Sequence, residues 1–498
     1  MLKLIPQVKE INIDNSKFMR VNHIALAENL LSDNAVKDFL DFCRLPAGET
    51  NIFFEEESSF DEEEYSVFIS DKITVKSSSV SGQIHALQTL KQIIFQCKGR
   101  IPFLQIHDKP KYKIRGFMLD AGRYFYSVSD VKKIIRRMAL HKLNFFHFHL
   151  TEDQGWRVET EKYPLLTEKG SKRSRTNFDH KPHSGYYTKN DIKEIVRYAH
   201  DFGIKVMPEF DIPGHSRAAI ACYKELSCFE RDLPVADHWG VKHDVLCVGK
   251  DSTFEFVYNV IDELCEMFPD EYIHIGGDEV VKHRWNLCPH CTAKRKELGI
   301  EDSDGLQFWF MNRVKEYCEA KGKKVFMWSW ELENDNSIDA DLGFTKCGEM
   351  NTGDRPFIDT STDAYYIDLP YGKVSLKNTA EHKPLSGNCL GVEATLWTEY
   401  VPDLKKGDRM SFPRVGAMSE TGWSGSCSYA DFEKKLRFYY SYLDENNIGY
   451  SNIGTANPNA LKGALEVLWF ERRQLAWEGL HNIFDDKKIE KLARNINR

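Results

Sequence analysis

The spacing of apolar positions along this chain changes near residue 110. Before that point, residues 65–70 and 72–76 alternate between apolar and polar, which predicts two strands. The segment that follows them, opened by Ser81, carries apolar residues at helical spacing. We therefore predict a small α+β domain over residues 1–110.

From Ile114 onward, short apolar runs alternate with helical segments. Their near-continuous hydrophobicity is typical of parallel strands buried on both faces. Eight runs qualify as strands: GFMLDA (116–121), NFFHFHL (144–150), IKVMPEF (204–210), YIHIGG (272–277), KKVFMWS (323–329), GFTKCG (343–348), DAYYID (363–368) and VEATLW (392–397).

Helix-start signals occur between these runs. Ser129 precedes a segment with Val131, Ile134, Ile135 and Met138 on one face, and Thr188 to Asp191 forms a capping-box pattern. Eight βα units predict a TIM (β/α)8 barrel over residues 111–450. A doubly wound open sheet is the alternative, because counting strands does not establish closure.

Residues 451–498 are predicted to form a helical segment packed on the barrel or on a partner subunit. Leu461, Leu465, Leu468 and Leu475 recur there at helical spacing. The sequence does not define the oligomeric state.

Composition narrows the functional classes. The 498 residues carry a formal net charge of −8 without a basic run, so neither nucleic acid nor an anionic membrane is expected as a partner. No apolar segment suits a signal or a membrane span, and twelve scattered cysteines indicate free thiols, so we expect a cytoplasmic protein. Cys288 and Cys291 form a lone CxxC, which we interpret as a loop-packing motif without metal.

Acidic and aromatic residues gather at the ends of the predicted strands. In a barrel these ends and the following loops form the active site. Carboxylates with tryptophans suit a sugar, whose hydroxyls need acceptors and whose ring faces need flat surfaces. The candidates are Asp120, Arg123, His147, His149, Glu152, Asp153, Glu209, Asp211, His215, Asp278, Glu279, Trp328, Trp330, Tyr366, Asp368, Trp397 and Glu399.

Seven motifs in order carry a family resemblance: RGFMLDAGRYF, HFHLTEDQGWR, PEFDIPGHSRA, HIGGDEV, YYID, ATLWTE and FPRVGAMSETGWS. The series, from about Ile114 to Ser424, resembles glycoside hydrolase family 20, the β-N-acetylhexosaminidases. The resemblance implies a barrel behind a small α+β domain, no cofactor, and an oligosaccharide or glycoconjugate with a terminal β-N-acetylhexosamine as substrate.

The acidic pair Asp278-Glu279 follows two glycines at a strand end. Neighbouring strand residues point in opposite directions, so the two carboxylates do not readily flank one scissile bond and different tasks are implied. By resemblance, Glu279 is the general acid and Asp278 orients the 2-acetamido group, which supplies the nucleophile and forms an oxazolinium intermediate.

The resemblance also implies the substrate contacts. Arg123 and Glu399 match residues that bind the 3- and 4-hydroxyls, and Asp368 matches one that meets the 6-hydroxyl. Tyr366 and Trp397 match the acetamide pocket. His215 resembles a histidine near the catalytic pair, for which we expect tuning of the acid.

Two positions depart from the family pattern or leave it open. Glu152 stands where the family commonly has an aspartate, which puts the placement of Arg123 or His215 in doubt if Glu152 supports them. Either Trp328 or Trp330 is the pocket tryptophan, and we favour Trp328 because it ends the apolar run.

Two other functions are alternatives. His147 and His149 form an HxH pair that, with Asp211, His215 and Asp278, could describe a metal-dependent barrel hydrolase. A non-catalytic carbohydrate-binding protein is the second, although it would not require a general acid. The sequence leaves open the preference for glucosaminide or galactosaminide and the leaving group.

Overall fold

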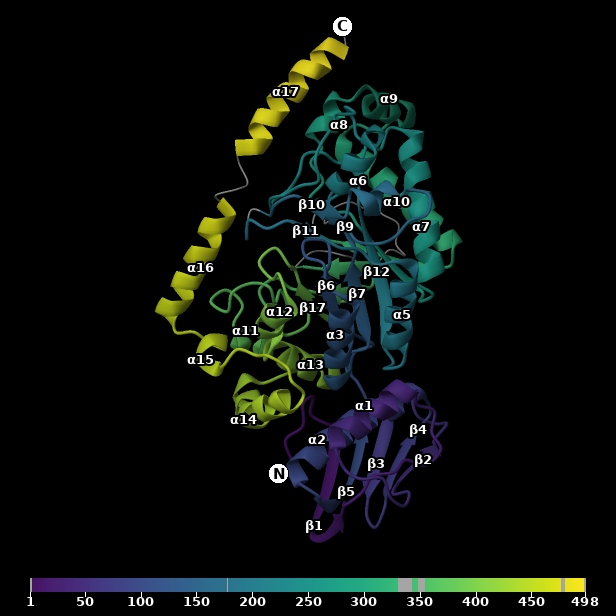
Figure 1. Ribbon diagram of the computed structural model, residues 1–498, viewed down its shortest axis with the longest axis vertical. Coiled ribbons are helices and arrows are strands. Elements are labelled where there is room, and N and C mark those ends of the chain that lie inside the picture. The colour runs from purple at the N-terminus through teal and green to yellow at the C-terminus, as the bar shows by residue number, and fades with distance from the viewer. Residues whose placement is uncertain (1, 177, 330–342, 348–353, 476–479, 497–498) are drawn as a thin grey trace.

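A closed barrel of eight parallel strands forms the centre of the computed structural model (Figure 1). The structure describes residues 2–176, 178–329, 343–347, 354–475 and 480–496. Each strand pairs with the next in chain order and the last pairs with the first, so the predicted barrel is confirmed and the open sheet is wrong. The strands are β6 (Ile114–Asp120), β7 (Phe145–His149), β12 (Lys205–Ile212), β13 (Tyr272–Gly276), β14 (Lys324–Trp328), β15 (Gly343–Lys346), β16 (Phe357–Asp359) and β17 (Cys389–Leu396).

Helices cover the outside of the barrel. Ser127 rather than Ser129 caps the first of them, because the Ser127 side chain accepts from the Asp130 backbone N–H. The capping box of Thr188 and Asp191 is confirmed. The outer helices are α3 (Val128–Leu140), α5 (Lys189–His200), α7 (Asp251–Met267), α10 (Ser303–Ala320), α11 (Leu376–Glu381) and α13 (Arg414–Ser424).

The seventh barrel strand differs from the prediction. It is β16, and the run 363–368 instead follows it as a turn that touches β17 through a single bridge between Tyr366 and Thr395. β16 has only three residues, too few for a periodic signal. The chain therefore places Tyr366 and Asp368 beyond the strand end, above the barrel.

Side chains fill the barrel interior in two layers, one apolar and one polar. The lower layer is apolar and consists of Ile114, Phe145, Met207, Tyr272, Phe326 and Ile358. Above it lies a fully buried polar layer of His147, Glu209, His274, Thr345 and Glu393. Its centre is Glu209, which accepts from the indole N–H of Trp328 at 2.6 Å and pairs with His274 at 3.1 Å. The floor of the site is thus a fixed polar network.

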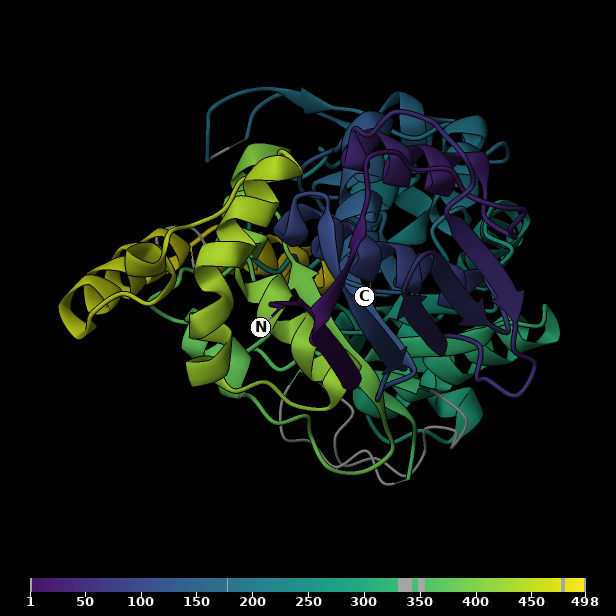
Figure 2. The ribbon, with the colours of Figure 1, turned by 90° about the horizontal axis from the view of Figure 1, so that it is seen from below.

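The N-terminal domain lies against the end of the barrel where the strands begin (Figures 1 and 2). Its sheet has the order β1-β5-β3-β4-β2, formed by β1 (Glu10–Arg20), β2 (Ile52–Glu56), β3 (Tyr65–Ile69), β4 (Ile73–Ser77) and β5 (Arg100–Asp108). The helices α1 (Asp33–Cys43) and α2 (Val80–Cys97) accompany the sheet, and Ser79 rather than Ser81 caps α2. The strands predicted at 65–70 and 72–76 are confirmed.

A buried ion pair joins the two units. Lys142 Nζ lies 2.9 Å from Asp108 Oδ2, and both side chains are fully buried. Asp108 also accepts from the Tyr65 hydroxyl at 2.6 Å and from the Trp423 indole N–H at 2.9 Å. Every carboxylate oxygen of this buried acid is therefore hydrogen-bonded.

Smaller elements lie in the loops. They are β8 (Thr151–Glu152), β9 (Gly155–Trp156), α4 (Leu165–Glu168), β10 (Lys172–Arg173), β11 (His183–Ser184), α6 (Arg217–Cys222), η1 (Lys224–Leu226), α8 (His283–Leu287), α9 (Pro289–Leu298), α12 (Leu404–Ser411) and α15 (Ile453–Ala456). The long helix α14 (Tyr429–Glu445) follows α13. Within the described part of the chain, we find no helix with the length and hydropathy of a membrane span.

Two terminal helices, α16 (Ala460–Leu475) and α17 (Leu480–Ile496), run along one side of the molecule (Figure 1). Leu461, Leu465 and Leu468 of α16 are 73%, 58% and 63% exposed, so they do not pack on the barrel. Packing of these leucines on a partner subunit stays a prediction. The side chain of Leu475 lies outside the described residues. The boundaries 1–110, 111–450 and 451–498 stay a prediction.

Candidate active site

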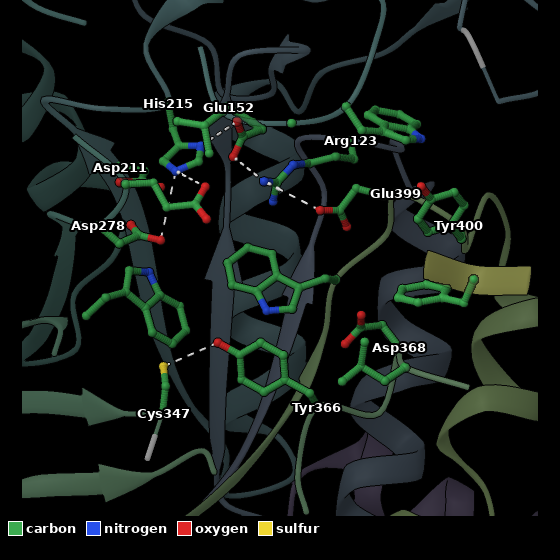
Figure 3. Close-up of a pocket in the computed structure, with 18 residues that line it drawn as sticks. Arg123, Glu152, Asp211, His215, Asp278, Cys347, Tyr366, Asp368, Glu399 and Tyr400 are labelled. Atoms are coloured by element: carbon green, nitrogen blue, oxygen red, sulfur yellow. Dashed lines mark hydrogen bonds and ion pairs between the residues drawn. The ribbon is translucent and has the colours of Figure 1, made fainter. Parts of the chain in front are cut away.

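The loops after the strand ends enclose a cavity of about 260 Å³ (Figure 3). All ten residues predicted for catalysis and substrate binding line it: Arg123, Glu152, His215, Asp278, Glu279, Trp328, Tyr366, Asp368, Trp397 and Glu399. They come from seven different strand ends, as the barrel mouth requires.

The end of β13 presents the acidic pair. Gly276 and Gly277 have φ values of +66° and +102°, and a Cβ on Gly276 would lie 1.8 Å from the Asp211 carboxylate oxygen. The glycines thus serve a tight turn and close packing on Asp211. Glu279 itself has φ +51°, a strained value for a residue with a side chain. This backbone aims the two carboxylates differently: the Asp278 side chain is 17% exposed and that of Glu279 is 41% exposed.

His215 links the pair to the rest of the site. Its Nε2 lies 3.9 Å from Asp278 Oδ2 and 3.5 Å from Glu279 Oε2, while its Nδ1 lies 2.8 Å from Glu152 Oε1. Burial lowers its pKa, but the carboxylates of Glu152, Asp211 and Asp278 outweigh that effect and raise the pKa well above 6.5. His215 is therefore an imidazolium held among acids.

The inner carboxylate of the pair is hard to ionise. Burial raises the pKa of Asp278 to about 7, against the opposing effect of His215 and with the support of the Glu279 charge. Asp211 behaves in the same way, because burial and the neighbouring Asp278 raise its pKa well above 3.8. Perturbed carboxyls in a cleft mark a functional site.

Glu152 supports both residues whose placement its extra methylene put in doubt. It contacts His215 at 2.8 Å and Arg123 Nη2 at 3.1 Å. Arg123 also faces Asp120 at 3.4 Å and Glu399 at 3.7 Å, and its guanidinium lies 5.0 Å from the Trp397 ring. The longer side chain thus keeps the arginine and the histidine at the cavity.

Aromatic rings wall the inner end of the cavity. Trp328 and Trp397 lie 5.4 Å apart between ring centroids, and the Tyr366 hydroxyl contacts Cys347 Sγ at 3.3 Å (Figure 3). Glu209 fixes the Trp328 ring from below. Trp328, the favoured tryptophan, therefore lines the pocket, while Trp330 lies outside the described residues.

Several polar atoms in the cavity face no protein partner. Among the described residues, Arg123 Nε, Asp278 Oδ1 and Asp368 Oδ1 are buried without a protein hydrogen bond. Buried polar groups normally have partners. Burial also raises the pKa of Asp368 well above 3.8 and raises that of Glu399. These groups suit the hydroxyls and the amide of a bound sugar.

The sequence did not point to part of the lining. The cavity is also lined by Trp239, Gly240, Val241, Cys347, Leu369, Tyr400 and Phe470. Phe470 belongs to α16 and lies 5.4 Å from Tyr400 between ring centroids. A single phenylalanine in a helical pattern carries no signal of function, so only the fold could reveal it.

The HxH pair does not form a metal site with free ligands. The two nitrogens of His147 lie 3.0 Å from Glu393 and 3.1 Å from Glu209. Burial lowers its pKa, but these carboxylates raise it to about 9. Neither His147 nor His149 lines the cavity, so the HxH pair offers no ligand to a metal bound there.

Comparison with protein families decides the relationship. Residues 112–426 match the glycosyl hydrolase family 20 catalytic domain, and residues 1–109 match domain 2 of that family. The chain belongs to glycosyl hydrolase family 20. The resemblance seen in the motif series is thereby confirmed.

Curated relatives in the family are hexosaminidases. The β-hexosaminidase of Porphyromonas gingivalis is 35% identical over 76% of this chain and 54% of its own length. The β-hexosaminidase of Akkermansia muciniphila is 32% identical over 74% of this chain and 80% of its own. The chain thus spans about half of the first relative and most of the second.

Solved structures of the family share the fold. A β-N-acetylhexosaminidase from Bacteroides fragilis superposes with a TM-score of 0.78 at 28% identity, over 93% of this chain and 98% of that one. A mutant Streptomyces plicatus β-hexosaminidase in complex with its product GlcNAc gives 0.79 at 28% identity, over 91% and 97%.

Proposed function

We propose that the protein is an exo-acting, retaining β-N-acetylhexosaminidase that removes terminal β-linked N-acetylglucosamine or N-acetylgalactosamine by substrate-assisted catalysis. One observation carries the proposal: the adjacent carboxylates of Asp278 and Glu279, with side chains 17% and 41% exposed, face the His215 ring in a cavity that Trp328, Trp397 and Tyr366 also line. The family membership and the GlcNAc product complex of the S. plicatus relative support it.

We propose different tasks for the two carboxylates of the pair. Asp278, deep in the cavity, accepts the acetamido N–H and stabilises positive charge while the acetamido carbonyl oxygen attacks the anomeric carbon. Glu279, at the more exposed position, donates its proton to the glycosidic oxygen. The bond from the anomeric carbon to that oxygen breaks, and its electron pair leaves with the aglycone. An oxazolinium ion remains.

The second half of the reaction reverses the proton transfer. Glu279, now a carboxylate, takes a proton from water as the water oxygen attacks the anomeric carbon. The bond from that carbon to the acetamido oxygen breaks, and its electron pair restores the neutral acetamide. Two displacements at one carbon give net retention. Trp328, Trp397 and Tyr366 hold the acetamide in attacking geometry, so that its carbonyl oxygen takes the place of a protein nucleophile.

The other side of the cavity is suited to bind the sugar hydroxyls. Arg123 offers a rigid fork of donors beside Glu399, which suits two adjacent hydroxyls. Asp368 has an unpaired oxygen for a third. His215, kept positive by its neighbours, lies near both catalytic carboxylates, and we propose that it tunes their ionisation. The stereochemical preference at the 4-position stays open.

A proton-NMR time course on an aryl β-N-acetylglucosaminide tests the proposal. We expect the β-anomer of free N-acetylglucosamine to appear first, and the matched aryl β-glucoside to be inert because it lacks the acetamido nucleophile. Hydrolysis of both glycosides at similar rates would assign the nucleophile to the protein. Initial release of the α-anomer would contradict retention.

The cytoplasmic location stays a prediction. In its support, all twelve cysteines of the chain are free thiols in the structure.

A further inference from the structure

Four cysteines from three separate segments converge beside the catalytic loops. Cys228 follows η1, Cys247 lies in the loop before α7, and Cys288 and Cys291 lie at the start of α9. The Sγ of Cys247 lies 3.7 Å from that of Cys288 and 3.6 Å from that of Cys291. Cys228 Sγ lies 3.9 Å from Cys291 Sγ, and all four sulfurs are within 4.8 Å of one another.

These separations match tetrahedral metal coordination. Four sulfurs placed ~2.3 Å from one zinc ion lie about 3.8 Å apart. A disulfide would require sulfurs about 2.05 Å apart. Cys247, Cys288 and Cys291 are buried and Cys228 is half-buried, so the site is closed and has no position for a substrate. That closure is typical of a structural rather than a catalytic zinc site.

The backbone around the sulfurs is built to hold them together. The Cys247 N–H donates to Leu226 O at 2.7 Å, next to a bridge between Ser227 and Leu246. The chain at Gly249 crosses the CxxC so closely that an added Cβ would lie 2.5 Å from the Cys291 nitrogen. Local strand pairing thus presents two sulfurs, and the start of a helix presents the other two.

The segments joined here carry the catalytic residues. The N–H of Leu246, the residue before Cys247, donates to the carbonyl oxygen of Pro213 at 2.9 Å. Pro213 lies two residues before His215. Trp285 lies six residues after Glu279 and three before Cys288. It donates its indole N–H to Leu246 O at 2.9 Å. We propose that Cys228, Cys247, Cys288 and Cys291 bind one structural Zn²⁺ that fastens the loop after β12 to the loop after β13.

The first experiment measures metal in the whole purified chain, by elemental mass spectrometry, and the zinc environment by X-ray absorption. We expect one zinc per chain with four sulfur ligands at about 2.3 Å. Neither readout depends on glycosidase activity or on a variant that folds. Protein without zinc, zinc with nitrogen or oxygen ligands, iron in its place, or a disulfide among these cysteines would each overturn the proposal.

Variants then identify the ligands. Cys228→Ser and Cys288→Ser should each lose most of the bound zinc and unfold at a lower temperature. The matched control is Cys265→Ser, because Cys265 is a half-buried free thiol on α7 outside the cluster. It should retain one zinc per chain. Full zinc content in both cluster variants would show that the metal binds elsewhere.

Discussion

At the scale of single residues, the site depends on one carboxyl whose ionisation is costly. The pKa of Asp278 is raised to about 7 by burial and by the charge of Glu279. To stabilise a positive intermediate it must be ionised, so the reaction requires the form that the fold disfavours. Such a conflict between stability and function is common in active sites.

We predict that the Asp278 carboxyl sets the acid limb of the pH profile. For the parent enzyme, kcat/KM should fall as the pH drops below about 7, since the carboxyl is then protonated. Asp278→Asn should lower kcat about 10²–10³-fold and remove that limb from the residual activity. Steady-state rates between pH 4 and 9 check this. An unchanged limb in the variant would assign it to another group, such as Asp211.

Asp278→Asn should lower activity but raise the free energy of unfolding relative to the parent. Because the folded pKa exceeds the usual 3.8, the native state holds a proton that the unfolded state has lost between about pH 4 and 7, and the free energy of unfolding falls across that window. Asp278→Asn removes this loss. Its unfolding temperature should therefore rise relative to the parent as the pH increases, and level off above pH 7.

At the scale of elements, the sequence predicted what depends on local periodicity. Seven of the eight barrel strands were apparent as apolar runs, because parallel strands are buried on both faces. The three-residue β16 was missed because tertiary pairing, not its own pattern, makes it a strand. The CxxC alone predicts packing, because Cys228 and Cys247, which lie beside it in the structure, are distant in sequence. The catalytic residues also come from separate loops, but each stands in a recognisable motif.

The turn after β13 offers a sharp comparison of two glycines. Gly276→Ala should cost about 1 kcal/mol for its positive φ and ~1–3 kcal/mol more for displacing Asp211, and should lower kcat. Gly299 has nearly the same φ, +69°, but nothing within 4 Å of an added Cβ, so Gly299→Ala isolates the backbone strain. Thermal unfolding and kcat measure the difference. Equal losses in both variants would mean that Asp211 gives way freely.

At the scale of the whole molecule, the small domain acts on the barrel through the end opposite to the site. Its contact centres on the buried pair of Asp108 and Lys142. Residues 1–109 match domain 2 of the family. We infer that the domain stabilises the barrel rather than touching substrate.

Breaking that pair should destabilise the whole chain. Lys142→Met leaves the Asp108 charge buried without its cation and should cost ~3–5 kcal/mol of the free energy of unfolding. Adding Asp108→Asn should recover part of the loss. Lys205→Met is the control, since that lysine is 47% exposed in its pair with Glu271 and should change stability by less than about 1 kcal/mol. Scanning calorimetry measures all three, and an unaffected Lys142→Met would refute a supporting role for the pair.

Phe470 reaches the cavity from α16, outside the barrel that supplies the catalytic carboxylates. Part of the cavity lining is therefore encoded outside the barrel, whereas the groups proposed to bind the sugar hydroxyls, Arg123, Asp368 and Glu399, lie within it. Exchanging the terminal helix would change the lining at Phe470 and leave the reaction centre intact.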